Sequence, residues 1–157
     1  MKKTILYRLF GLGAIPRRVR PVLEKEGVLV LDEGMGGWFI TRNVKAPGKR
    51  YVRRSEGFSG SLAVTKKRIV CFTYWKRQMN ISVDDSKLSS LYVNTSNEQT
   101  LSISFASSDF RKAWQGVIEF RFTTEKARRF QEVLTTLGAR PGTADRKSTR
   151  LNSSHYS

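Results

Sequence analysis

Hydrophobic and polar residues alternate along several short stretches of the chain. Large apolar side chains occupy every second position in Met79–Val83, Leu101–Ala106 and Val117–Phe122. Successive side chains of a β-strand point to opposite faces, so this alternation is typical of strands with one buried face. We therefore predict a half-buried strand in each of the three stretches.

Other strands are predicted from apolar runs between turn-forming residues. Val28–Asp32 is a short apolar run between glycines and Trp38–Val44 alternates in polarity, so Gly34–Gly37 would form a turn between two strands. The next stretch, Lys45–Gly60, contains a Pro-Gly turn signal and further glycines, and is predicted to be an irregular loop. Leu88–Val93 is a weaker strand candidate.

The stretch GSLAVTKKRIVCF, from Gly60 to Phe72, predicts a β-hairpin. Its turn contains Lys66 and Lys67, which we expect to remain solvated, while the hydroxyl of Thr65 bonds to the turn backbone. Four residues of the two strands are expected to reach the core: Leu62, Val64, Ile69 and Cys71.

The spacing of apolar residues changes to that of a helix in Thr124–Leu137, which Gly138 and Pro141 follow as stop signals. The whole pattern predicts a mainly β fold of seven or eight antiparallel strands. These would close into a barrel or orthogonal sandwich, with the C-terminal amphipathic helix across one open end. Five aromatic residues are predicted to face the interior: Trp38, Phe105, Phe120, Phe122 and Phe130.

Residues 1–25 form a basic N-terminal segment. Four of its apolar residues fall at helical spacing and predict a short amphipathic helix: Ile5, Leu6, Leu9 and Phe10. Such a helix could lie on an anionic membrane or pack on the domain, and the sequence leaves both alternatives open. Because Arg8 interrupts the apolar stretch and no small-residue cleavage site follows, we do not expect a secretory signal.

Residues 140–157 show no apolar periodicity, so we predict a disordered tail beyond a domain at residues 26–139. Within this tail, Asp145–His155 (DRKSTRLNSSH) resembles the conceptual translation of a sequencing-library adapter. We therefore set residues 145–157 aside as non-native. This removes three cations, one anion and the chain's one histidine, and the chain remains strongly basic.

The charge of the chain indicates an anionic partner. Lysine and arginine total 29 against 13 aspartate and glutamate residues, which gives a formal net charge of +16. Such a field attracts a membrane surface, nucleic acid or an acidic protein, and does not choose among them. The sequence has no apolar run long enough to span a membrane, and its one cysteine suits a reducing compartment. We expect a cytoplasmic protein that associates peripherally with the inner face of the membrane.

The candidate chemistry argues against an enzyme. Without His155, no Ser-His-Asp or Cys-His arrangement and no histidine-containing metal site can be built. Asp84 and Asp85 lie between two strands beside serines, which is typical of a solvated turn rather than of an acid–base pair. The glycine groups lack the lysine and the strand-to-helix context of a phosphate-binding loop. We therefore expect no catalysis, no cofactor and no metal.

Three stretches resemble pleckstrin-homology-like domains, in particular the GRAM-type and bacterial branches of that superfamily. They are the hairpin Gly60–Phe72, the strand region Met79–Val93, and the strand and helix of Val117–Leu134. The resemblance covers about Glu26 to Gly138. It implies a small split barrel with a helix across one end, which serves as a binding module for membrane lipids or for proteins and not as an enzyme.

In lipid-binding members of that superfamily, basic residues on the loop between the first two barrel strands hold the ligand. If Val28–Asp32 is the first strand here, that loop is Glu33–Gly37 and has no cation. We favour Trp38–Val44 as the first strand, although the superfamily's usual spacing of basic residues is not clearly present. The loop then offers five candidates for anion or lipid binding: Lys45, Lys49, Arg50, Arg53 and Arg54.

We therefore expect a non-enzymatic binding module that associates with anionic membrane lipid, or another anionic partner, through this loop. A secondary basic patch is predicted at Arg17, Arg18 and Arg20. The mixture of cations with aromatic residues would also suit single-stranded nucleic acid, although no nucleic-acid motif accompanies it. A protein partner that pairs with an exposed sheet edge is the third alternative.

Overall fold

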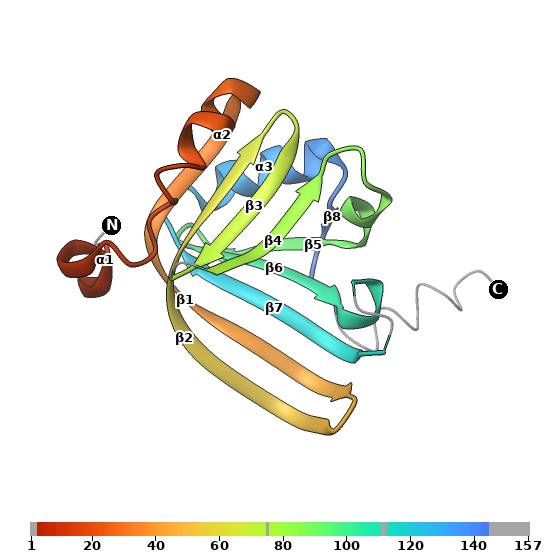
Figure 1. Cartoon of the computed structure of the whole chain (residues 1–157). Coiled ribbons are helices and arrows are strands. Elements are labelled where there is room, and N and C mark those ends of the chain that lie inside the picture. Colours follow the sequence, from red (N-terminus) through yellow and green to blue (C-terminus); the bar gives the residue numbers. More distant parts are fainter. Residues whose placement is uncertain (1–2, 75, 111–112, 145–157) are drawn as a thin grey trace.

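One curled sheet of eight strands forms the body of the protein in a computed structural model, which describes residues 3–74, 76–110 and 113–144 without the side chains of residues 46, 49 and 51 (Figure 1). The strands are β1 (Val28–Ala46), β2 (Lys49–Thr65), β3 (Arg68–Thr73), β4 (Lys76–Ser82), β5 (Tyr92–Asn97), β6 (Thr100–Ala106), β7 (Gln115–Thr123) and β8 (Arg140–Pro141). The α-helices are α1 (Ile5–Phe10), α2 (Arg20–Glu26) and α3 (Ala127–Leu137), and the 3-10 helices are η1 (Ser86–Ser90) and η2 (Ser107–Asp109).

The strand order is β4-β3-β2-β1-β7-β6-β5-β8, and every pairing except that of β5 with β8 is antiparallel. The sheet curls into a half-barrel whose concave side holds the main core, and α3 packs there through Phe130, Val133 and Leu134. This arrangement confirms the predicted mainly β, barrel-like fold with a C-terminal amphipathic helix.

The predicted turn at Gly34–Gly37 is wrong, because β1 runs without interruption through these residues. The register with β2 shifts between Asp32 and Met35, and Gly34 has a φ of 69°. A β-bulge of this kind inserts residues into one strand and needs the left-handed conformation that glycine adopts without strain. The glycines therefore bend a single strand where the sequence suggested two.

The predicted loop at Lys45–Gly60 is also wrong, since most of it belongs to β2. Its pairing with β1 is continuous up to a tight turn at Pro47–Gly48. β3 pairs only with the inner end of β2, from Gly60 to Val64, so the outer half of β2 is an edge. Charged side chains on such an edge oppose unwanted strand pairing, which explains how a strand can have the polar composition of a loop.

The bulge also decides which aromatic residues reach the core. Phe105, Phe120, Phe122 and Phe130 are buried as predicted. Trp38 is 53% exposed, so its predicted inward position is wrong. The bulge reverses the alternation of β1, and the adjacent Phe39 turns inward to meet Phe120 with ring centroids 5.0 Å apart. Trp38 instead packs on the outer side beside Gly57.

The hairpin of β2 and β3 confirms its prediction. The hydroxyl of Thr65 accepts hydrogen bonds from the amides of Lys67 and Arg68, each at 3.0 Å, and both lysines of the turn are exposed. Cys71 is fully buried, and burial raises the pKa of its thiol. The three other residues expected in the core are also fully buried: Leu62, Val64 and Ile69.

Two consecutive carboxylates at the bulge hold the N-terminal segment. Asp32 accepts hydrogen bonds from the side chains of Lys3 and Thr124, each at 2.6 Å. Burial would raise the pKa of Asp32, but these donors outweigh burial and hold that pKa below its ordinary value. Glu33 accepts three bonds from the same segment: from the Tyr7 hydroxyl, the Ile15 amide and the Arg20 guanidinium.

The segment then crosses the outer side of the sheet and covers a second, smaller core. Ile15 and Leu23 bury there against β2 and β3 residues, which include Ala63, Val70 and Phe72. The strands β2 and β3 are therefore buried on both faces at this point. Of the two alternatives for the N-terminal segment, a membrane contact or packing on the domain, the second holds for the part that contains Ile15 and Leu23. Helix α1 itself contributes no buried residue.

The domain extends past its predicted end at residue 139. Arg140–Pro141 pairs with β5 as β8, and the amide of the buried Ala144 donates to the Ser104 hydroxyl at 2.8 Å. The predicted disordered tail is therefore wrong for residues 140–144, whose backbone hydrogen bonds compensate for the missing apolar periodicity. Residues 145–157 lie outside the described residues.

We expect Gly37→Ala to destabilise the protein by about 1–3 kcal/mol, the usual cost of overpacking. A Cβ at Gly37 would lie 2.3 Å from the Arg121 carbonyl oxygen, which belongs to the paired strand and cannot move aside easily. Gly57→Ala is the matched control, because its Cβ would meet nothing closer than 3.7 Å. Urea denaturation of both variants measures the difference, and equal midpoints would contradict this packing.

Candidate functional site

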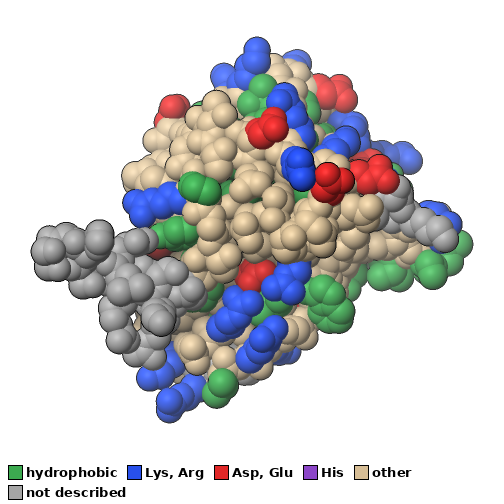
Figure 2. Space-filling view, turned by 180° about the vertical axis from the view of Figure 1, so that it is seen from behind, with side chains coloured by type: hydrophobic (Ala, Val, Ile, Leu, Met, Phe, Trp, Pro, Cys, Tyr) green, Lys and Arg blue, Asp and Glu red, His purple; other side chains and the backbone are tan. Residues whose placement is uncertain are grey.

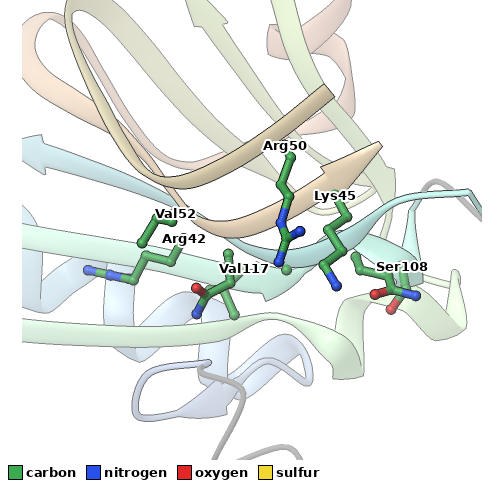
Figure 3. Close-up of a pocket in the computed structure, with 9 residues that line it drawn as sticks. Arg42, Lys45, Arg50, Val52, Ser108 and Val117 are labelled. Atoms are coloured by element: carbon green, nitrogen blue, oxygen red, sulfur yellow. The ribbon is translucent and has the colours of Figure 1, made fainter. Parts of the chain in front are cut away.

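The tip of the β1–β2 hairpin brings two of the five predicted cations together. Lys45 is the next-to-last residue of β1 and Arg50 is the second residue of β2, and the two residues are opposite one another in the register. Their side chains run side by side into a recess of about 320 Å³ (Figure 3). Neither side chain makes an ion pair or hydrogen bond with any residue that the structure describes. Two uncompensated positive charges therefore face the same space.

The recess also contains uncharged polar groups and a close approach of two strands. Asn43, Ser108 and Gln115 contribute polar groups, and Gly116 lines it from β7. A Cβ at Gly116 would lie 2.6–2.7 Å from the carbonyl oxygens of Asn43 and Arg42. Asn43 has a positive φ of 52° and lies at the register irregularity between β1 and β7. Strand β7 can approach this irregularity only because position 116 has no side chain.

Arg53 and Arg54 do not line this recess. Arg54 forms an ion pair with Glu56 at 2.6 Å and faces the concave side of the sheet. Arg53 is exposed and lies opposite Arg42 in the register. Lys49 is the first residue of β2 and pairs with Ala46, and its side chain is outside the described part of the structure. The prediction treated the five as one loop, whereas β2 places Arg50 in the recess and Arg54 in a different pocket.

Arg42 also lines the recess and was missed by sequence reasoning. Its guanidinium turns away from Lys45 and Arg50 and pairs with Glu119 at 2.8 Å. Glu119 is 2% exposed and accepts further bonds from Arg121 and Ser102. Burial would raise the pKa of Glu119, but the bonds from Arg42 and Arg121 outweigh it, so this pKa lies below its ordinary value. The signal in the sequence was a single arginine on the otherwise apolar side of Trp38–Val44.

A hydrophobic side chain lies among the cations. Val52 lines the same recess and is 79% exposed, the largest exposed fraction among the large hydrophobic residues in the described part of the chain. Figure 2 shows lysine and arginine side chains gathered over the lower part of the molecule, where the hairpin lies, with hydrophobic groups between them. The tip thus combines positive charge with an exposed apolar group.

Only two of the three arginines in the predicted secondary basic patch are exposed to solvent. Arg17 and Arg18 are exposed, whereas Arg20 forms an ion pair with Glu33 at 2.6 Å and helps to hold the N-terminal segment. Arg20 therefore has a structural contact, and the patch is reduced to two arginines.

The described residues include no group of three or more histidine, cysteine, aspartate or glutamate side chains that could hold a metal ion. Asp85 caps η1 by accepting a hydrogen bond from the Lys87 amide, as its predicted turn role requires. Within the same part of the chain, none of the helices has both the length and the apolar character needed to cross a membrane.

Comparison with known proteins adds no family to these observations. A scan against protein-family models finds no match, and a search of curated proteins finds no significant relative. The resemblance to pleckstrin-homology-like domains therefore stays a prediction. The function is inferred from the residues and geometry of the site.

We expect Glu119→Gln to lower stability at pH 7 by about 1–3 kcal/mol, because it weakens the bonds from Arg42 and Arg121. The folded pKa lies below an unfolded value of about 4.3, so the carboxylate stabilises the protein above that pH. This contribution is lost as the pH falls from the unfolded towards the folded pKa. The variant should therefore show a flatter dependence of unfolding free energy on pH below about 4.3.

Urea denaturation at a series of pH values measures this difference. The control is Glu98→Gln, which removes an exposed carboxylate paired with Arg128 at the surface. Parallel pH profiles for the wild type and Glu119→Gln would contradict the role of the buried charge.

Proposed function

We propose that the protein is a non-enzymatic binding module that associates with anionic membrane surfaces through the tip of the β1–β2 hairpin. The observation that carries this proposal is the position of Lys45 and Arg50, unpaired among the described residues, beside the exposed Val52. Peripheral binding needs charge for attraction and apolar groups for insertion, and each lysine or arginine near an anionic leaflet contributes about 1 kcal/mol.

The helix α1 offers a second membrane contact. Leu9 and Phe10 are each 69% exposed, and Ile5 and Leu6 are also exposed. Tyr7 points the other way, onto Gly34, and fixes the helix to the bulge. A short helix whose apolar side chains face solvent next to exposed arginines fits the interfacial layer of a membrane. Figure 1 places α1 at the far end of the hairpin from the tip.

The composition of the recess favours lipid over nucleic acid. Single-stranded nucleic acid binds by stacking bases on aromatic side chains, and the described lining of the recess contains none. The aliphatic Val52 offers no such platform. A protein partner that pairs with the free edge of β2 would bind through backbone hydrogen bonds, which salt affects little.

Charge reversal at the tip tests the main proposal. We expect Lys45→Glu with Arg50→Glu to weaken binding to phosphatidylglycerol vesicles at least tenfold, since two attractive charges become repulsive. The matched control is Lys66→Glu with Lys67→Glu, which reverses two exposed lysines in the β2–β3 turn. Flotation or sedimentation with vesicles at two salt concentrations measures the affinity. Equal binding of the wild type to neutral and anionic vesicles would exclude the proposal.

Substitution in α1 tests the second contact. We expect Leu9→Asp with Phe10→Asp to reduce vesicle binding about tenfold without unfolding the domain, because both side chains are exposed. Circular dichroism checks the fold. Unchanged vesicle binding by this variant would restrict the membrane contact to the hairpin tip.

A further inference from the structure

The concave side of the half-barrel contains an apolar cavity of about 350 Å³ that shares no lining residue with the basic recess. Its apolar lining comes from four strands and includes Phe39, Val44, Met79, Ile81, Phe105 and Phe120. Small-molecule pockets range from about 300 to 1,000 Å³, so this volume suits a single narrow chain rather than a two-chain lipid.

One polar group in the cavity has no partner. The hydroxyl of Thr41 makes no hydrogen bond with any described residue, although Thr41 is only 7% exposed and lines the cavity. A buried hydroxyl without a partner is destabilising, and native structures rarely leave one unpaired. The position therefore points to a ligand atom that accepts a hydrogen bond.

A positive charge lies beside this hydroxyl. Arg54 is directly opposite Thr41 in the β1–β2 register and lines the same cavity. Its ion pair with Glu56 is half-exposed on both sides, and such surface pairs contribute little to stability. A guanidinium has five N–H donors, so Arg54 can bind a second carboxylate while its existing contacts persist. Thr41 and Arg54 thus place a hydrogen-bond donor and a positive charge side by side in a cavity whose lining is largely apolar.

We propose that this cavity binds a single-chain carboxylate amphiphile, a fatty acid. The acyl chain lies among Phe39, Phe105 and Phe120, and the carboxylate accepts hydrogen bonds from Thr41 and Arg54. This site is distinct from the proposed membrane contact, because the cavity and the basic recess share no lining residue.

Calorimetric titration with dodecanoate, without vesicles and below its micelle concentration, tests the proposal. We expect saturable binding of one dodecanoate per protein, and weaker binding of shorter acids by about fourfold per methylene removed. Dodecyltrimethylammonium has the same chain and the opposite charge, so it should bind at least tenfold more weakly. No saturable binding of dodecanoate, or equal binding of the two amphiphiles, would overturn the proposal.

Substitutions at Thr41 and Arg54 test the assigned contacts. Thr41→Val and Arg54→Gln should each weaken dodecanoate binding about tenfold or more. The matched controls are Arg53→Gln, the neighbouring arginine outside the cavity, and Thr123→Val, an exposed threonine of β7, and neither should change affinity. Thr41→Val should also leave the melting temperature of the ligand-free protein unchanged or raised, because it removes an unpaired buried hydroxyl. Equal affinity of Arg54→Gln and Arg53→Gln would remove Arg54 from the site.

The two proposals can fail separately. The Lys45→Glu, Arg50→Glu variant should bind dodecanoate as the wild type does, whatever its behaviour with vesicles. A parallel loss of dodecanoate binding in that variant would show that bulk charge, and not the cavity, attracts the acid.

Discussion

The bulge at Asp32–Gly34 is the constraint on which the rest of the structure depends. It adds residues to β1 relative to β2 and so reverses which residues of β1 face the core. Before the bulge Val30 faces inward, and after it Met35 and Phe39 do. The same bend presents Asp32 and Glu33 to the N-terminal segment, which they hold by hydrogen bonds and ion pairs. One local irregularity thus positions the core, the outer layer and the two faces of the hairpin.

The length of the β1–β2 hairpin explains why charged residues can form a strand. Between Lys49 and Ser59, β2 pairs with β1 on one side and with no strand on the other. This outer half therefore gains half the ladder hydrogen bonds of a central strand. Arginine and lysine on that edge discourage association with other chains. The same exposure leaves Lys45 and Arg50 accessible to solvent, as the proposed membrane contact requires.

The sequence could predict the elements that depend on the periodicity of hydrophobic residues and on short-range hydrogen bonds. The Thr65 turn, the strands at Met79–Val83, Leu101–Ala106 and Val117–Phe122 and the helix after Thr124 follow from side-chain spacing and short-range hydrogen bonds. The strand predicted at Leu88–Val93 is wrong in its first half, which belongs to η1, and β5 begins only at Tyr92. The sequence could not predict that Gly34–Gly37 continues a strand, because glycine suits both a turn and a β-bulge. It failed for Lys45–Gly60 for a related reason, since the polar composition of an edge strand is that of a loop. These two errors placed Trp38 in the core and the five cations on one surface.

The continuous hairpin makes the two proposed sites neighbours that do not overlap. Along β1, Thr41 faces the concave cavity and Arg42 turns to the other side, where it neutralises Glu119. Along β2, Arg54 lines the cavity while Arg50 lines the recess at the tip. Because the two pockets share no lining residue, a substitution can disable one site with little effect on the other. An irregular loop would not fix such a separation. The hydrogen-bonded ladder between β1 and β2 keeps Arg50 in the recess apart from Arg54 in the cavity.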